Sequence, residues 1–270
     1  MLAVHGMGDT KEDFADDLRQ KLAAKLGDDW SRVYFDSIYY QSVFQDNEER
    51  VMDAMSQVPL DALALRRFVL FGFSDATGLE RQAEKPNRPY QQVQTIIRDT
   101  LRRAYRSLGG PRPVVLIAQS LGCQVMSNYL WDAQKNAASR GVWRAPRTRR
   151  GSELDDFLRL KTLRYFYTTG CNIPIFLAGF PETDIRAVKV DRDGYAFRWK
   201  NFYDPDDVLG WPLRPLSPSY DKAVDADVPI SAGGSLLGHL AYSWNTLSHL
   251  KYWQDNEVLK PLAADLKTLL

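Results

Sequence analysis

The chain has 270 residues, 44% of them hydrophobic and 26% charged, with 17 Gly and 14 Pro. This composition excludes disordered, collagen-like and low-complexity classes and fits one large globular domain. The 35 basic and 34 acidic residues nearly cancel, to a formal net charge of +1. Because no overall field attracts polyanions, we expect no nucleic-acid partner.

The apolar runs are too short for a membrane helix. The longest, such as Val114-Val115-Leu116-Ile117-Ala118, have the length of a strand, whereas a span needs about 20 apolar residues. The two cysteines cannot form a disulfide framework, and the residues after Met1 resemble a strand rather than a signal peptide. We therefore expect a cytoplasmic protein without an integral membrane segment; the sequence does not define its oligomeric state.

The first third of the chain begins with a short apolar run that stops at a glycine turn. We predict a strand over 1–4, a helix over 14–26 that Gly27 closes, and a second strand over 32–40. Residues 41–88 contain helical patches at 51–55 and 60–73. We interpret 41–88 as an excursion that could cap the site.

The rest of the chain alternates strands and helices. We predict helices over 90–108, 123–135 and 258–269, and strands over 114–119, 163–170 and 196–203. A second possible excursion is 132–155, which includes the basic surface loop 140–151. Strand 114–119 is apolar on both faces, which is typical of the centre of a parallel sheet. The pattern predicts a single α/β domain over 1–270, with about six mainly parallel strands flanked by helices on both faces.

Ser120 is the candidate nucleophile. It follows the apolar strand in Ala118-Gln119-Ser120-Leu121-Gly122 and precedes a helix. A serine on a tight strand-to-helix turn lies at a helix N-terminus, where backbone N–H groups face it. The turn needs small residues two positions before and after the serine, and Ala118 and Gly122 satisfy this. The alternative is a serine that only caps the following helix.

The loop His5-Gly6-Met7-Gly8 follows the first strand. Acyl transfer needs donors for the negative oxygen of the tetrahedral intermediate, and two backbone N–H groups are the usual source. We assign these to Met7 and Leu121. A phosphate-binding loop is the alternative, but the Gly-Lys-Ser/Thr and Gly-x-Gly-x-x-Gly patterns are missing.

A serine hydroxyl needs a base, and the chain has 3 histidines. His5 belongs to the loop above, where its ring would brace the turn. His249, just before Tyr252-Trp253 and the final helix, is the favoured base, and His239, in a glycine-rich stretch, is the alternative.

The imidazole in turn needs a carboxylate to fix its tautomer and stabilise its charged form. Candidates follow strand 196–203. Asp206 is favoured, Asp207 is close behind and Asp204 is third, with Asp184 a distant alternative. All could instead be turn formers, because Asp-Pro-Asp is typical of turns.

The chain resembles the α/β-hydrolase superfamily, in particular its minimal lipase- and esterase-like serine hydrolases. The resemblance lies in the order Ser120, Asp206, His249, in the strand–Ser–helix turn and in the upstream His-Gly loop. The chain departs from the family at Ala118, where the common pattern has glycine. It also begins at the strand that carries the oxyanion loop, so the family's first two strands have no counterpart.

These residues predict hydrolysis of a carboxylic ester of a small-molecule acyl substrate through an acyl-enzyme on Ser120. The alternatives are a thioesterase or amidase, an acyltransferase with the same first half-reaction, and a non-catalytic binding domain on the same scaffold. No organic cofactor is implied, and the Cys and His residues show no metal-ligand spacing. Trp211, Trp244 and Trp253 are candidates to line an acyl pocket, with core packing as the alternative.

Overall fold

The computed structural model covers the whole chain. It describes residues 1–8, 10–58, 61–78, 89–134, 141–144, 148–190, 196–231 and 251–270, and structural statements concern these ranges. His239, His249 and Trp244 lie outside them.

A six-stranded sheet forms the centre of the fold, with strand order β2-β1-β3-β4-β5-β6. The strands are β1 (Leu2–Val4), β2 (Asp36–Ile38), β3 (Val114–Gln119), β4 (Leu163–Thr169), β5 (Arg198–Tyr203) and β6 (Ala226–Pro229). Every neighbouring pair is parallel. The loops after β1, β3, β4 and β5 therefore leave the same edge of the sheet.

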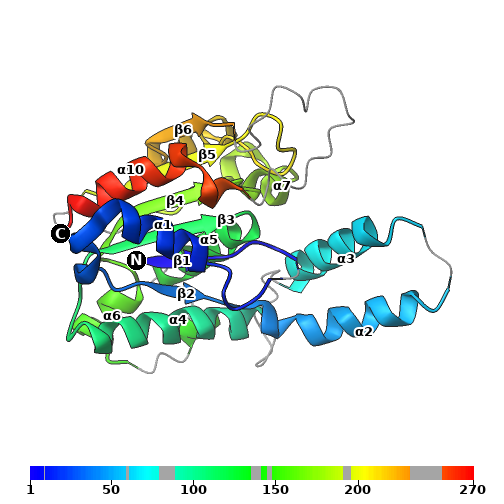
Figure 1. Ribbon diagram of the computed structural model, residues 1–270, viewed down its shortest axis with the longest axis horizontal. Coiled ribbons are helices and arrows are strands. Elements are labelled where there is room, and N and C mark those ends of the chain that lie inside the picture. The colour runs from blue at the N-terminus through cyan, green and yellow to red at the C-terminus, as the bar shows by residue number, and fades with distance from the viewer. Residues whose placement is uncertain are drawn as a thin grey trace.

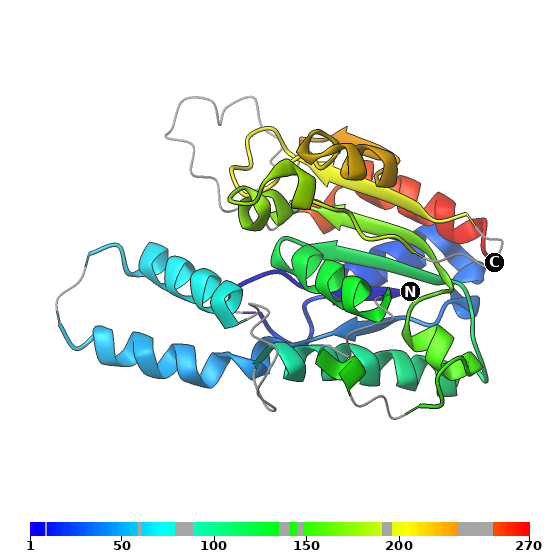
Figure 2. The same cartoon turned by 180° about the vertical axis from the view of Figure 1, so that it is seen from behind.

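Helices cover both faces of the sheet (Figures 1 and 2). The α-helices are α1 (Asp16–Leu26), α2 (Gln45–Met55), α3 (Leu63–Gly78), α4 (Pro89–Ser107), α5 (Leu121–Gln134), α6 (Glu153–Leu158), α7 (Ile173–Leu177), α8 (Pro218–Ala223) and α10 (Asn256–Lys267). Short 3-10 helices include η1 (Gly27–Arg32), η2 (Gln41–Val43), η3 (Gly141–Arg144), η4 (Glu182–Asp184), η5 (Arg214–Leu216) and η7 (Tyr252–Gln254).

The alternation of side chains along the strands divides the interior into two cores. Leu116 and Ala118 of β3 pack with α4 and α5, whereas Val115 and Ile117 pack with α1 and α10. All four side chains are at most 2% exposed. The prediction that this strand is buried on both faces is confirmed.

Helices α2 and α3 lie side by side and form an arm that projects from the body of the molecule (Figure 1). The arm occupies the described part of the predicted excursion 41–88. In the second predicted excursion, η3 packs on α4, where the Val142 N–H donates to Gln94 Oε1 at 3.0 Å. Of the basic residues in loop 140–151, Arg149 and Arg150 are exposed.

The predicted α/β class with a parallel sheet is confirmed. The strand predicted over 32–40 is shorter, because residues 27–32 continue from α1 as a 3-10 helix. The sequence did not single out β6, which is only four residues long and ends at Pro229. No helix among the described residues is long and apolar enough to cross a membrane.

Candidate active site

Ser120 occupies a strained turn between β3 and α5. Its φ is +50°, a region that non-glycine residues rarely adopt, and its N–H donates to Thr169 O at 2.9 Å. A serine that caps a helix has extended backbone and accepts a hydrogen bond from the first turn. Within the described chain, the buried Ser120 Oγ has no hydrogen-bond partner. The helix-cap alternative is therefore wrong.

Two glycines allow the loop after β1 to approach this turn. A Cβ on Gly122 would lie 2.3 Å from His5 O, and a Cβ on Gly6 would lie 2.8 Å from Ser120 Cβ. Neither position can accept a side chain without movement of the loop or the turn. The small residue that the sequence required at 122 is thus explained by contact with the backbone of the β1 loop.

The His5 ring holds the loop from inside. Its Nε2 accepts from the Tyr40 N–H at 3.0 Å, so Nδ1 carries the proton and donates to Gly6 O at 2.7 Å. The ring stacks on Tyr40 with centroids 3.9 Å apart. Burial lowers the pKa of His5 to about 4. His5 is a neutral brace at physiological pH, as the sequence suggested, and both ring nitrogens are already engaged.

Both backbone groups predicted to hold an oxyanion border Ser120. Leu121 is the first residue of α5, and the first-turn N–H groups of a helix have no acceptor within the helix. Met7 follows Gly6 in the loop that contacts Ser120, and it lines a cavity of about 170 Å³ together with Ser120, Phe14 and Trp253. The cavity therefore lies beside the turn that contains Ser120.

A buried carboxyl pair lies on the other side of the loop, where sequence reasoning missed it. The Gly8 N–H donates to Asp75 Oδ2 at 3.3 Å, and Gln41 Nε2 donates to Glu48 Oε2 at 3.2 Å. Burial, and secondarily Glu48, raise the pKa of Asp75 to about 8. Burial also raises the pKa of Glu48. Because these residues come from α3 and α2, no spacing in the sequence brings them together.

The arm also touches the loop through Met7. A Cβ on Gly72 of α3 would lie 2.5 Å from Met7 Sδ, so the helix backbone packs directly on this side chain. The inner end of the arm therefore contacts the loop that contains Met7, one of the two predicted oxyanion donors.

The carboxylates after β5 differ in exposure. Asp206 is exposed, whereas Asp204 and Asp207 are 4% and 5% exposed. Asp207 Oδ2 accepts from Tyr252 Oη at 2.8 Å, and Asp204 Oδ1 accepts from the Asp206 N–H at 3.0 Å. Asp184 is exposed in η4. Of the carboxylates in this turn, Asp204 and Asp207 are thus buried and hydrogen-bonded, whereas Asp206 is not buried.

Tyr252 and Trp253 join this turn to Ser120. Tyr252 Oη accepts from the Asp204 N–H at 2.8 Å, and Trp253 Nε1 donates to Thr169 Oγ1 at 3.1 Å. Of the three predicted pocket tryptophans, Trp253 lines the Ser120 cavity, and Trp211 is 44% exposed. Tyr252 and Trp253, which follow the predicted base His249 in the sequence, thus lie beside the acidic turn and the Ser120 cavity.

The site has no metal-binding arrangement in its described part. No group of three or more His, Cys, Asp or Glu side chains in the described ranges could hold a metal ion. Cys123 is buried, and its thiol donates to Ala118 O at 3.3 Å. Burial holds the pKa of Cys123 well above its usual value.

Comparisons with known proteins found no matching family model and no similar curated protein.

Proposed function

We propose that the protein is a serine hydrolase of the α/β-hydrolase type that cleaves a carboxylic ester. One observation carries this proposal: Ser120 adopts φ +50° at the strand-to-helix turn with a buried, unpartnered hydroxyl among the described residues. Strain of this kind costs on the order of 1–3 kcal/mol, and it persists where the surrounding structure requires it, commonly at active sites.

In the proposed reaction, Ser120 Oγ attacks the acyl carbon while His249 takes its proton. The backbone N–H groups of Met7 and Leu121 stabilise the negative oxygen. Collapse breaks the bond to the alcohol, which leaves with the proton from His249, and water activated by His249 then releases the acid. All groups come from this chain, without an organic cofactor.

The placement of the base rests on chain connectivity. His249 is two residues before Lys251 in the sequence. Tyr252 and Trp253 contact the acidic turn and the Ser120 cavity. The short sequence separation of His249 from Tyr252 and Trp253 supports it as the base over His239, which is ten residues further away in sequence.

For the acid, we propose one carboxylate of the turn after β5. Asp206 is the choice from the sequence, whereas burial favours Asp207 and Asp204. We expect Asp→Asn at the acid to lower kcat by several orders of magnitude, because the tautomer of the base is then wrong. Turnover of the variants Asp204→Asn, Asp206→Asn and Asp207→Asn, compared at equal folded fraction, identifies the residue.

A fluorophosphonate probe tests the nucleophile. We expect labelling of the wild type and none of Ser120→Ala. Ser127→Ala is the matched control, because Ser127 is a buried serine of α5, the helix that follows Ser120, and this variant should label normally. Labelling of folded Ser120→Ala at the wild-type rate would refute the proposal, and a wild type that never reacts would favour a non-catalytic domain. Product analysis with added alcohols or thiols separates hydrolysis from acyl transfer.

We further propose that the protein acts in the cytoplasm on a small-molecule acyl substrate and not on nucleic acid. The balanced charge and the cysteine content support this.

A further inference from the structure

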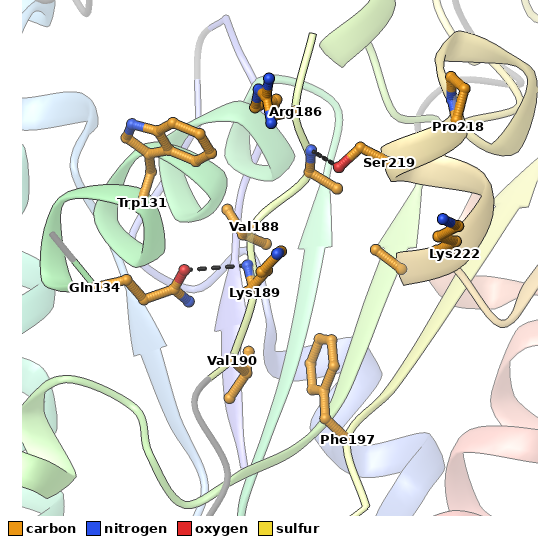
Figure 3. Close-up of a pocket in the computed structure, with 12 residues that line it drawn as sticks. Trp131, Gln134, Arg186, Val188, Lys189, Val190, Phe197, Pro218, Ser219 and Lys222 are labelled. Atoms are coloured by element: carbon orange, nitrogen blue, oxygen red, sulfur yellow. Dashed lines mark hydrogen bonds between the residues drawn. The ribbon is translucent and has the colours of Figure 1, made fainter. Parts of the chain in front are cut away.

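A second cavity lies on the α5 side of the sheet, away from Ser120. Its volume is about 590 Å³, which is within the usual range for small-molecule sites. Trp131 and Gln134, which line it, come from the far end of α5 (Figure 3). They follow Ser120 by 11 and 14 residues, so they lie roughly 16–21 Å further along the helix axis.

The cavity is built on an extended segment, residues 185–190, that runs between α5 and α8 (Figure 3). Three hydrogen bonds to neighbouring elements fix the segment, and in one of them Ser217 Oγ donates to Ile185 O at 2.9 Å. The Ala187 N–H donates to Ser219 Oγ at 3.0 Å, and the Lys189 N–H donates to Gln134 Oε1 at 3.0 Å. The side-chain oxygen atoms of Ser219 and Gln134, the two uncharged polar residues of the lining, thus already accept hydrogen bonds from the backbone.

The inner surface of the cavity is apolar. Val188, Val190 and Phe197 are 2%, 8% and 4% exposed, and each lines the cavity. Phe197 lies at the end nearest the start of β5 (Figure 3). A ligand in contact with these side chains would place hydrocarbon, and not a polar ring, against them.

The rim of the cavity is basic. Arg186, Lys189 and Lys222 line it and are exposed, and no Asp or Glu is among the lining residues. Across the described part of the chain, none of these three side chains forms an ion pair. Three cations around an apolar interior complement a ligand with one negative head and a hydrocarbon body.

We propose that this cavity binds an alkyl carboxylate, the chemical class of free fatty acids. The carboxylate lies at the rim among Lys189, Lys222 and Arg186, and the chain lies along Val188, Val190 and Phe197. The proposal does not rest on the proposed hydrolysis. If that reaction is correct, its acid product belongs to the same class, and the cavity is a second site for it.

Calorimetric titration of the Ser120→Ala protein with octanoate, nonanoate and decanoate tests the chain-length dependence without turnover. We expect one site that tightens roughly fourfold per methylene, the effect of burying one CH₂. Nonyltrimethylammonium, with the same nine-carbon chain as decanoate and the opposite charge, should bind at least tenfold more weakly than decanoate. Equal affinity for the three acids, or for the cation, would overturn the proposal.

Charge variants locate the site. Lys189→Gln or Lys222→Gln should each weaken decanoate about two- to fivefold, as expected for one exposed ion pair. The double variant Lys189→Glu/Lys222→Glu should lose at least tenfold. Its matched control is Lys260→Glu/Lys267→Glu, which changes two exposed lysines of α10 and should bind as before. An equal loss of decanoate affinity in both double variants would show a non-specific charge effect and refute the site. Undiminished binding by Lys189→Glu/Lys222→Glu would refute it as well, because the ligand would then bind elsewhere.

Discussion

The contact between Gly122 and the β1 loop gives the sharpest test of the candidate site. In Gly122→Ala, the new Cβ would lie 2.3 Å from His5 O and 3.0 Å from Val4 O. Both are backbone atoms of a buried strand end, so no flexible side chain can move aside. Either α5 or the loop that precedes Met7 must shift.

Two effects of opposite sign determine the size of the change. Alanine is favoured over glycine within a helix by up to about 1 kcal/mol. Overpacking of a well-packed interior costs about 1–3 kcal/mol, and contact with backbone falls at the upper end. We therefore expect a net loss of about 1–2 kcal/mol in the free energy of unfolding.

The effect on catalysis is expected to be larger than the effect on stability. A shift of His5 displaces the Met7 N–H, and loss of one oxyanion donor costs about 2.7–4 kcal/mol of barrier stabilisation, or 10²–10³ in kcat. Urea unfolding and turnover of an activated ester measure the two effects separately.

Gly179→Ala is the control for this experiment. A Cβ there meets no atom of the described residues within 4 Å, so both quantities should stay close to wild type, within about 0.5 kcal/mol for stability. A Gly122→Ala protein at least as stable as the wild type, with full activity, would show that the loop and the turn are not in the contact described, and the reasoning would fail.

Three further predictions concern buried polar groups. Because the folded pKa of His5 is lowered to about 4 from 6.5, the unfolded chain binds its proton first as pH falls, and from pH 7 to 5 this group should remove about 2 kcal/mol of stability. In urea titrations, His5→Gln should lose this dependence of the unfolding free energy on pH, and an unchanged dependence would contradict the burial argument. The pH dependence of stability due to Asp75 has the opposite sign, because its folded pKa is raised to about 8 from 3.8 and its contribution to stability falls as pH rises through this range. The gain in stability of Asp75→Asn over wild type should therefore be larger at pH 8 than at pH 5, and equal gains at both pH values would count against a protonated Asp75. Tyr252→Phe removes the hydroxyl shared by Asp204 and Asp207 and should cost about 1–3 kcal/mol of unfolding free energy; a loss below 0.5 kcal/mol on the same scale would mean that water replaces the hydroxyl.

The sequence by itself determined the fold class and the position of the strand-to-helix turn at Ser120. Strand 114–119 is apolar at every position but its last, and short-range patterns of this kind depend only on neighbouring residues. Because parallel strands place their carboxyl ends at one edge, the groups after 1–4, 114–119 and 196–203 could be assigned to one site before any coordinates. The strained turn at Ser120 followed from the same pattern.

Only the tertiary structure decided which groups surround that turn. Asp204, Asp206 and Asp207 are indistinguishable as sequence, and burial alone separates them, because it depends on Tyr252, nearly fifty residues later. Likewise, Asp75 and Glu48 meet beneath Gly8 because two helices of the arm fold back on the loop. Burial and long-range contact are properties of the packed chain, and a local pattern of residues contains neither.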